Sequence, residues 1–245
     1  MKKTFLIIAT ALTGFMANTA TAQTVDELVD KHVQAMGGAD KLNNLKSVKI
    51  SSSMQMMGTD LTQNLTIIDQ KAFRQDIIVQ GMTMVQVIDG NKGWGINPMV
   101  DPVNATPTPD EQVKMMTDQL DLKGSLVNYK AKGNTVELVG KENVGTAETY
   151  KLKIGKKNNV TEFINLDAKT YLPIRTTTIA NVQGKEFKQE TSSSNFQKVD
   201  GITFPFAVEV KGDALPGGGP VAVTVTKVEV NPTVDESIFK MPAKK

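Results

Sequence analysis

Residues 48–96 read VKISSSMQMMGTDLTQNLTIIDQKAFRQDIIVQGMTMVQVIDGNKGWGI, and this stretch decides the fold. Apolar and polar residues alternate through most of it, which is the period of a β-strand with two different faces. Tight turns such as Asp89-Gly90 separate the runs, so consecutive strands should pair antiparallel. We expect strands over residues 48–56, 61–67, 73–79, 82–88 and 94–96. Between Phe73 and Ile88 both strand faces carry apolar residues, which predicts cover on both sides of the sheet there.

Further strand patterns follow from Val136 to the end of the chain. They include residues 150–154, 160–166, 172–179, 187–196, 204–210 and 221–230. The flexible run Gly217-Gly218-Gly219 lies between the last two and predicts a hairpin loop. About ten strands therefore give an α+β, β-dominated fold, and a sheet of this size either curls or splits into stacked layers.

Three helical segments interrupt the strands. Thr24 and Glu27 form a capping box for a helix that should end at Gly37-Gly38. A short helical turn is expected at residues 40–45. A second capping box, Thr108 with Glu111, predicts a helix from Pro109 to Asp121 that sets Val113, Met116 and Leu120 on one face, with Met115 at its edge.

Methionine is concentrated in the first half of the chain after residue 22. Eight of the ten methionines beyond that point lie between residues 54 and 116: Met54, Met56, Met57, Met82, Met84, Met99, Met115 and Met116. Methionine is flexible and polarizable, so it suits apolar surfaces that accept varied partners, but it also fills ordinary cores. The cluster is compatible with a protein that binds an apolar ligand and with a core that happens to use methionine.

The N-terminus indicates secretion. Lys2 and Lys3 precede an apolar run over residues 5–15, and Ala20-Thr21-Ala22 is a small-residue cleavage site. We expect a signal peptide over residues 1–22, cleavage after Ala22, a single domain over residues 23–245 and a periplasmic location. Loss of Lys2 and Lys3 brings the formal charge from +2 to zero. The chain then lacks the excess of positive charge that nucleic-acid binding requires.

The sequence carries no recognisable catalytic constellation. Cysteine is absent, and His32 is the one histidine, so we expect no zinc site, no cofactor and no enzymatic activity. His32 is interpreted as a packed or surface residue. Arg74 could hold an ester carbonyl or a lid through its planar donors, although a solvated strand residue is the simpler interpretation.

An ordered set of short motifs resembles one family. Residues 87–98, VIDGNKGWGINP, are similar to a hairpin of the outer-membrane lipoprotein-sorting proteins, which are called LolA-like. Phe73-Arg74 lies upstream, as in that family, and residues 167–175, DAKTYLPIR, resemble its next turn and strand. Residues 199–205 and 234–242 also fit. Lys71 is followed by Ala72 where the family has proline, so we transfer the family's lid-holding arginine to no position here.

The resemblance implies an open antiparallel β half-barrel with helices covering its concave, apolar face. It also implies a periplasmic carrier that shields acyl chains of lipoproteins or other lipids on their way to the outer membrane. The partners would be an inner-membrane donor and an outer-membrane acceptor. We expect the groove and its moving helix to use Met54, Met56, Leu65, Phe73, Ile77, Met82, Met84, Trp94, Met115, Met116 and Leu120.

Two alternatives remain open at this point. The same scaffold could serve as a regulatory module that senses a lipid or lipoprotein and signals through a protein partner. An enzyme acting on lipids is less consistent with the sequence, because it needs a nucleophile and a base and the chain has a single histidine.

Overall fold

The computed structural model describes residues 23–56, 58–157, 160–182, 184–213, 215 and 219–244. The expected signal peptide and its cleavage site lie outside the described residues, as do Met57 and most of the glycine run near residue 217. Among the described residues, no helix is long and apolar enough to cross a membrane.

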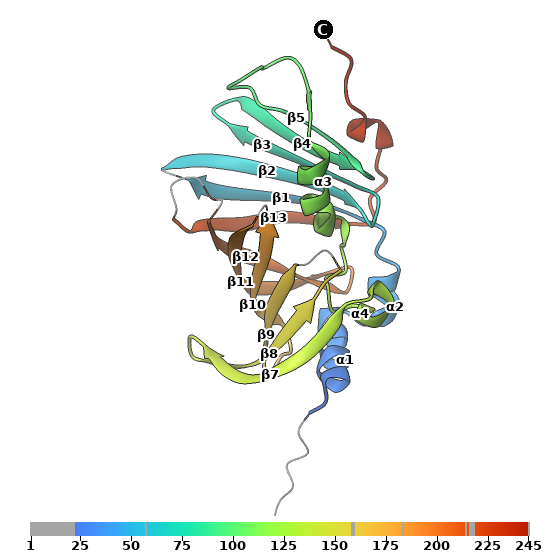
Figure 1. The fold of residues 1–245 in the computed structure, drawn as a ribbon, viewed down its shortest axis with the longest axis vertical. Coiled ribbons are helices and arrows are strands. Elements are labelled where there is room, and N and C mark those ends of the chain that lie inside the picture. The colour runs from blue at the N-terminus through green and yellow to red at the C-terminus, as the bar shows by residue number, and fades with distance from the viewer. Residues whose placement is uncertain are drawn as a thin grey trace, which may run out of the picture.

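One curved antiparallel sheet dominates the structure (Figure 1). Its 13 strands follow the order β6-β5-β4-β3-β2-β1-β13-β12-β11-β10-β9-β8-β7. The strands β6 and β7 form two separate edges, so the sheet is open, as the half-barrel prediction requires. Their bounds are β1 Ser47–Met56, β2 Thr59–Ile68, β3 Ala72–Val79, β4 Met82–Asp89, β5 Lys92–Ile96, β6 Thr106–Pro107, β7 Thr135–Val144, β8 Ala147–Gly155, β9 Thr161–Asp167, β10 Pro173–Val182, β11 Lys185–Val199, β12 Ile202–Gly212 and β13 Val221–Val230.

The sequence predicted about ten strands, so the count was too low. The predicted strand signals correspond to every strand except β6, which has two residues and is too short to leave a periodic signal in the sequence. The helices are α1 Val25–Met36, α2 Ala39–Asn43, α3 Asp110–Met116 and α4 Tyr129–Lys132, with 3₁₀ helices η1 Thr117–Leu120 and η2 Glu236–Phe239.

The first helix begins and ends as its sequence predicted. The Thr24 side chain accepts from the Glu27 amide, and the Glu27 carboxylate accepts from the Thr24 amide. Gly37 ends the helix at φ 132°, and a Cβ there would lie 2.6 Å from the Gly201 carbonyl oxygen. Only glycine combines this backbone conformation with such a close approach to β12.

The predicted capping box of the third helix is wrong. Pro109 is the N-cap of α3, and no side chain caps this helix end. The Thr108 amide instead donates to the Gly93 carbonyl, because the chain is still paired with β5 at that point. The predicted apolar stripe is confirmed: Val113 and Leu120 are buried and Met116 packs against the same core.

The helices α1, α2, α3 and η1 pack on one face of the sheet, which is the concave face (Figure 1). There α2, α3 and η1 share a core with the right-hand ends of the first strands, formed by Leu42, Leu45, Val48, Ile67, Phe73, Ile88, Val113, Leu120, Val127 and Ile202. On the half of the sheet formed by β7–β9, α1 packs through Leu28 and Val29. Its partners there are Leu126 and the strand residues Leu152, Ile154, Ile164 and Leu166.

The convex face of β3, β4 and β5 is covered by the C-terminal segment. Phe239 of η2 is buried with Ala72, Val85, Val87 and Trp94. The Trp94 Nε1 donates to the Phe239 carbonyl at 2.8 Å. The prediction of cover on both sides is therefore confirmed at the Phe73–Ile88 end of these strands, where α3 packs on the concave face. It is wrong at the other end, because Met82 and Met84 on the concave face are 37% and 36% exposed.

We predict that Phe239→Ala costs about 3–5 kcal/mol of unfolding free energy, because it empties a buried aromatic site. Trp94 is the one tryptophan and contacts this site, so its fluorescence during urea unfolding reports the change. The control Met241→Ala lies two residues on, is 41% exposed, and should stay within about 0.5 kcal/mol. A loss below about 1 kcal/mol for Phe239→Ala would show that the C-terminal segment is not integral to the fold.

Candidate functional site: an uncovered apolar trough

Strand register defines which residues share the helix-bearing face. Met54 lies opposite Leu61 on β2 and opposite Val223 on β13. Ile77 lies opposite Met84, and Val79 lies opposite Met82. Directly opposed residues of an antiparallel pair point to the same face. Phe73 and Ile88 belong to the same alternation and pack against α3, so this face is the concave one.

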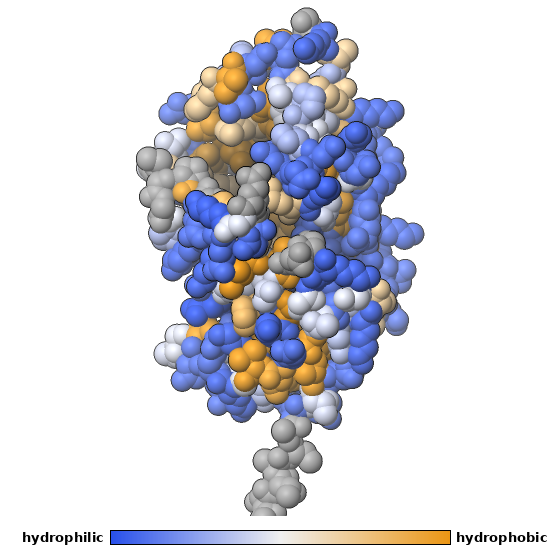
Figure 2. Space-filling model, viewed as in Figure 1, coloured by the Kyte–Doolittle hydropathy of each residue, from blue (hydrophilic) through white to orange (hydrophobic). Residues whose placement is uncertain are grey.

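Short helices leave part of this face uncovered. We call its accessible apolar strip the trough floor, and every member of it is half-buried or exposed. Figure 2 shows a hollow beside α3 that is lined by hydrophobic residues. The trough floor consists of Met54, Met56, Leu61, Ile77, Val79, Met82, Met84, Val208, Val210, Val223 and Val225.

The segment α3–η1 divides the concave side into two cavities. The first has a volume of about 440 Å³ and lies between β3–β5 and the start of α3, with Ile77, Met84 and Gln112 in its wall. The second, of about 580 Å³, lies between η1, α1 and β9–β11, and Met115 and His32 line it. Displacement of α3–η1 would therefore join two existing spaces.

The structure brings most of the predicted groove residues to this side. Met54, Met56, Ile77, Met82 and Met84 lie on the trough floor, and Met115 lines the second cavity. Four others lie beneath or in the α3–η1 segment and belong to the core: Leu65, Phe73, Met116 and Leu120. Met116 Sδ also accepts a hydrogen bond from Gln86 Nε2 at 3.2 Å.

The prediction that Trp94 belongs to the groove is wrong, because this residue lies on the convex face. It is opposite Val87, which packs under the C-terminal segment, and it is 6% exposed. The turn at Gly90-Asn91 could have revealed this, since Lys92 must then oppose Asp89, which places residue 94 opposite residue 87.

Arg74 also points away from the trough. Its guanidinium forms an ion pair with Asp76 at 2.8 Å and donates to the Ile238 carbonyl at 2.8 Å. It therefore anchors the C-terminal segment to the convex face. Both earlier interpretations, a contact to an ester or lid and a purely solvated residue, are wrong.

The valines on the second half of the trough floor were not among the predicted groove residues. Val223 of β13 and Val208 of β12 oppose each other and continue the row of Met54. Each strand shows the alternation, but the pairing of β1 with β13 joins segments that are more than 150 residues apart. A single sequence carries no signal for that pairing.

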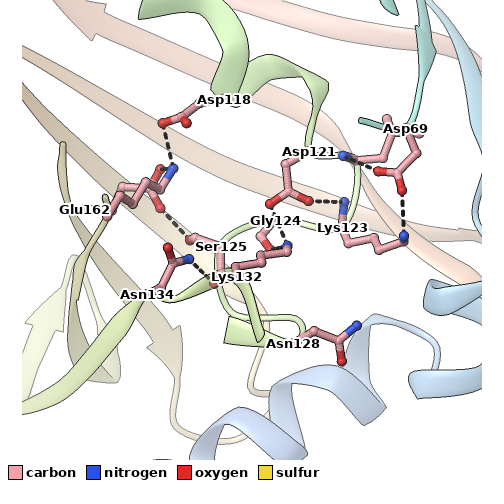
Figure 3. A network of polar contacts seen from close by, with 12 residues as sticks. Asp69, Asp118, Asp121, Lys123, Gly124, Ser125, Asn128, Lys132, Asn134 and Glu162 are labelled. Atoms are coloured by element: carbon pink, nitrogen blue, oxygen red, sulfur yellow. Dashed lines mark hydrogen bonds and ion pairs between the residues drawn. The ribbon is translucent and has the colours of Figure 1, made fainter. Parts of the chain in front are cut away.

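A polar network anchors η1 and the following loop at the second cavity (Figure 3). The Lys156 ammonium lies 3.0 Å from Asp118 of η1 and also pairs with Glu162 of β9. Ser125 Oγ donates to the other oxygen of Glu162. Further along the same loop, Lys123 pairs with Asp69 at 2.6 Å.

Burial opposes the charge on Lys156, yet the carboxylates of Glu162 and Asp118 outweigh it and raise the pKa of the ammonium. Lys156 and Glu162 are each 13% exposed at the side chain. Buried charges of this kind are tolerated only as a pair, because each alone would lose its hydration without compensation. The network therefore fixes where η1 meets the sheet.

His32 is a packed residue, as predicted, and also borders the second cavity. Its Nδ1 lies 3.1 Å from the Tyr171 carbonyl oxygen, which only accepts, so Nδ1 carries the proton. Burial lowers the pKa of the imidazole, and the hydrogen bond to Tyr171 opposes that shift only in part. The side chain is therefore neutral at pH 7.

Among the described residues, no group of three or more His, Asp or Glu side chains could hold a metal ion. The arrangement that the structure does offer is an apolar, accessible concavity next to two cavities of mixed lining. It fits burial of a flexible apolar molecule with a polar end.

Comparison with known proteins finds no matching family model and no matching curated protein. Solved structures do match. A LolA superfamily protein of Nitrosomonas europaea aligns with TM-score 0.55 and 13% identity over 89% of this chain and 98% of that chain. A DUF1329 family protein of Desulfovibrio piger gives TM-score 0.55 and 14% identity over 89% and 98%. A domain of Vibrio parahaemolyticus described as lipoprotein-sorting gives 0.54 and 10% over 87% and 94%.

The chain therefore has a LolA-like fold: an open, curved antiparallel sheet with short helices on its concave face. The resemblance carried by the motifs around residues 87–98 and 167–175 is confirmed at the level of the fold.

We predict that Lys156→Met destabilises the protein by about 3–5 kcal/mol, because it leaves the buried Glu162 carboxylate without its cation. Urea unfolding at pH 7 measures the effect. The matched control Lys114→Met breaks an ion pair whose lysine is 72% exposed and should leave the urea midpoint close to that of the natural protein. Equal effects in the two variants would contradict the anchoring role of Lys156.

We predict that burial of His32 makes the free energy of unfolding decrease as the pH falls below 6.5, which is the ordinary pKa of histidine. The folded state holds the imidazole neutral, whereas the unfolded chain takes up a proton, so acidification favours unfolding. In His32→Asn the amide replaces the Nδ1 donor but does not titrate. The urea midpoint should fall less for His32→Asn than for the natural protein between pH 7.5 and pH 5.5, and an identical fall would refute the assignment.

Proposed function

We propose that this protein is a periplasmic, non-enzymatic carrier that binds the acyl chains of lipoproteins or other lipids on the trough floor. The observation that carries the proposal is the accessible row of methionine and valine side chains on the concave face, which the helices of the described chain leave uncovered. The lipoprotein-sorting description of the Vibrio structure supports the same class of cargo.

The energetics suit a carrier. Burial of each methylene is worth about 0.8 kcal/mol, so a chain of about 16 carbons gains roughly 13 kcal/mol wherever it leaves water. A membrane and an apolar trough bury the acyl chain with a similar gain in free energy, so the free energy of transfer between them is close to zero. A site of this kind takes up and releases cargo without a chemical step.

The α3–η1 segment is the part that deeper binding would move. Its displacement exposes Val113, Met116 and Leu120, which costs about 5–9 kcal/mol at 1.5–3 kcal/mol for each side chain. Spontaneous opening is therefore rare. Cargo that first contacts the uncovered floor and then replaces the contacts of α3 would offset that cost.

The cargo would come from an inner-membrane donor and pass to an outer-membrane acceptor. The secretory character of residues 1–22 and the resemblance to lipoprotein-sorting proteins support delivery in this direction. A regulatory sensor on the same scaffold would instead hold its ligand or partner stably, so release kinetics separate the two functions.

We predict that Met84→Glu weakens binding of a fluorescent fatty acid at least tenfold, about 1.4 kcal/mol, because a carboxylate would be desolvated beneath the chain. Met84 is 36% exposed, so the variant should fold with a stability change of about 0.5 kcal/mol or less.

The matched control is Met241→Glu, the same substitution at a residue that is 41% exposed and lies outside the trough. It should leave affinity unchanged. Equal affinities for Met84→Glu, Met241→Glu and the natural protein would contradict binding on the trough floor.

A further inference from the structure

The connection between β5 and β6 presents apolar side chains to solvent. Met99 is 74% exposed, Val100 82% and Val103 51%. These three residues lie within five positions of the chain, at the end of the molecule where the C-terminal segment also lies (Figure 1). Hydrophobic surface is visible at that end in Figure 2. We call residues 97–104 the apolar tip.

The backbone of the apolar tip satisfies its own donors. The Met99 amide donates to the Asn97 side chain, and the Val100 and Asp101 amides donate to the Asn97 carbonyl. The amides of Val103 and Asn104 both donate to Asp101 Oδ1 at 3.0 Å.

Beyond Asn97, the other two positions of the tip are Pro98 and Pro102, which have no N–H to satisfy. Every backbone donor from residue 98 to residue 104 is thus either absent or bonded within the tip. Hydrocarbon excludes backbone donors that lack a partner, because each one costs several kcal/mol there. A loop built this way can enter a lipid layer without leaving the amide N–H groups of residues 98–104 unpaired.

The tip also borders the site. Val100 and Asp101 form part of the wall of the first cavity, which Ile77 and Met84 of the trough share. Lys244 of the C-terminal segment lies close enough to Asp101 to lower the pKa of that carboxyl, after the larger effects of its hydrogen bonds to Asn104 and Val103. The positive charge of Lys244 therefore acts on the tip, and it would also attract lipid phosphates there.

We propose that the apolar tip inserts into the surface of a phospholipid bilayer and holds the mouth of the first cavity against it. The inference rests on the proposed carrier function and adds the surface through which cargo enters or leaves. An acyl chain would then pass between bilayer and trough without crossing bulk water. The internal hydrogen bonds pre-order the tip, so insertion loses little conformational entropy.

The absence of cysteine allows a site-specific test on the full chain. Met99→Cys, labelled with an environment-sensitive NBD dye, is mixed with vesicles of phosphatidylethanolamine and phosphatidylglycerol. We expect a blue shift and a several-fold rise in emission. The matched control Val139→Cys labels an exposed aliphatic residue, 55% exposed, on the far edge strand β7 and should not respond. No response at Met99, or an equal response at Val139, would overturn the proposal.

A second variant avoids the dye. Met99→Ser/Val103→Ser removes two tip side chains that line neither of the two cavities described above, and vesicle flotation should show at least a tenfold loss of binding. Flotation equal to that of the natural protein would overturn the proposal. A natural protein that is dimeric by light scattering and becomes monomeric in this variant would also overturn it, because the tip would then contact a second copy.

Fatty-acid binding in the absence of vesicles separates this inference from the carrier function. If the natural protein binds fatty acid but does not float with vesicles, insertion of the tip into a bilayer is refuted. Binding of acyl chains on the trough floor would then still stand. If flotation depends on the tip but the protein binds no fatty acid, insertion of the tip is supported and the proposed carrier function is refuted.

Discussion

A large open sheet with too little helix to cover it is the constraint on which the rest of this structure depends. Thirteen strands at about 4.8 Å spacing form an arc of roughly 60 Å. The 12 residues of α1 make a helix of about 18 Å, and α3 with η1 adds about 16 Å. Because each helix covers the width of only about two strands, much of the concave face must stay open to solvent or to a ligand.

The two faces of the sheet meet this constraint differently. On the convex face the C-terminal segment covers β3–β5, and Arg74 and Trp94 hold it through the carbonyls of Ile238 and Phe239. On the concave face the trough floor remains uncovered, part of it forms a wall of the first cavity, and its side chains are methionine, valine, leucine and isoleucine. The segment that partly closes this face is held by Lys156 and its two carboxylates, so polar contacts fix a lid whose underside is apolar.

Local signals in the sequence predicted the elements well. The capping box at Thr24 set the start of α1, and alternation over residues 48–56 put Met54 on the same face as Val48, because these features depend on near neighbours. Trp94 was misplaced although the two-residue turn before β5 determines its face, so that error lay in the reading of the register.

Other features had no local signal. The valines of β12 and β13 reach the floor only through the pairing of β1 with β13. Lys156, Asp118 and Glu162 come from separate segments and meet only in the folded chain. The motifs around residues 87–98 supplied the LolA-like fold because hairpin sequences are local, whereas the extent of the trough depends on how distant strands are ordered.

The most direct test of the central claim is mass spectrometry of the protein after secretion into a bacterial periplasm and purification without detergent. Native spectra give the bound mass, and an organic extract identifies it. The account predicts a phospholipid or acylated peptide at a stoichiometry near one, which exchanges into added vesicles. A folded, stable protein that carries no lipid and takes none up from vesicles would contradict it.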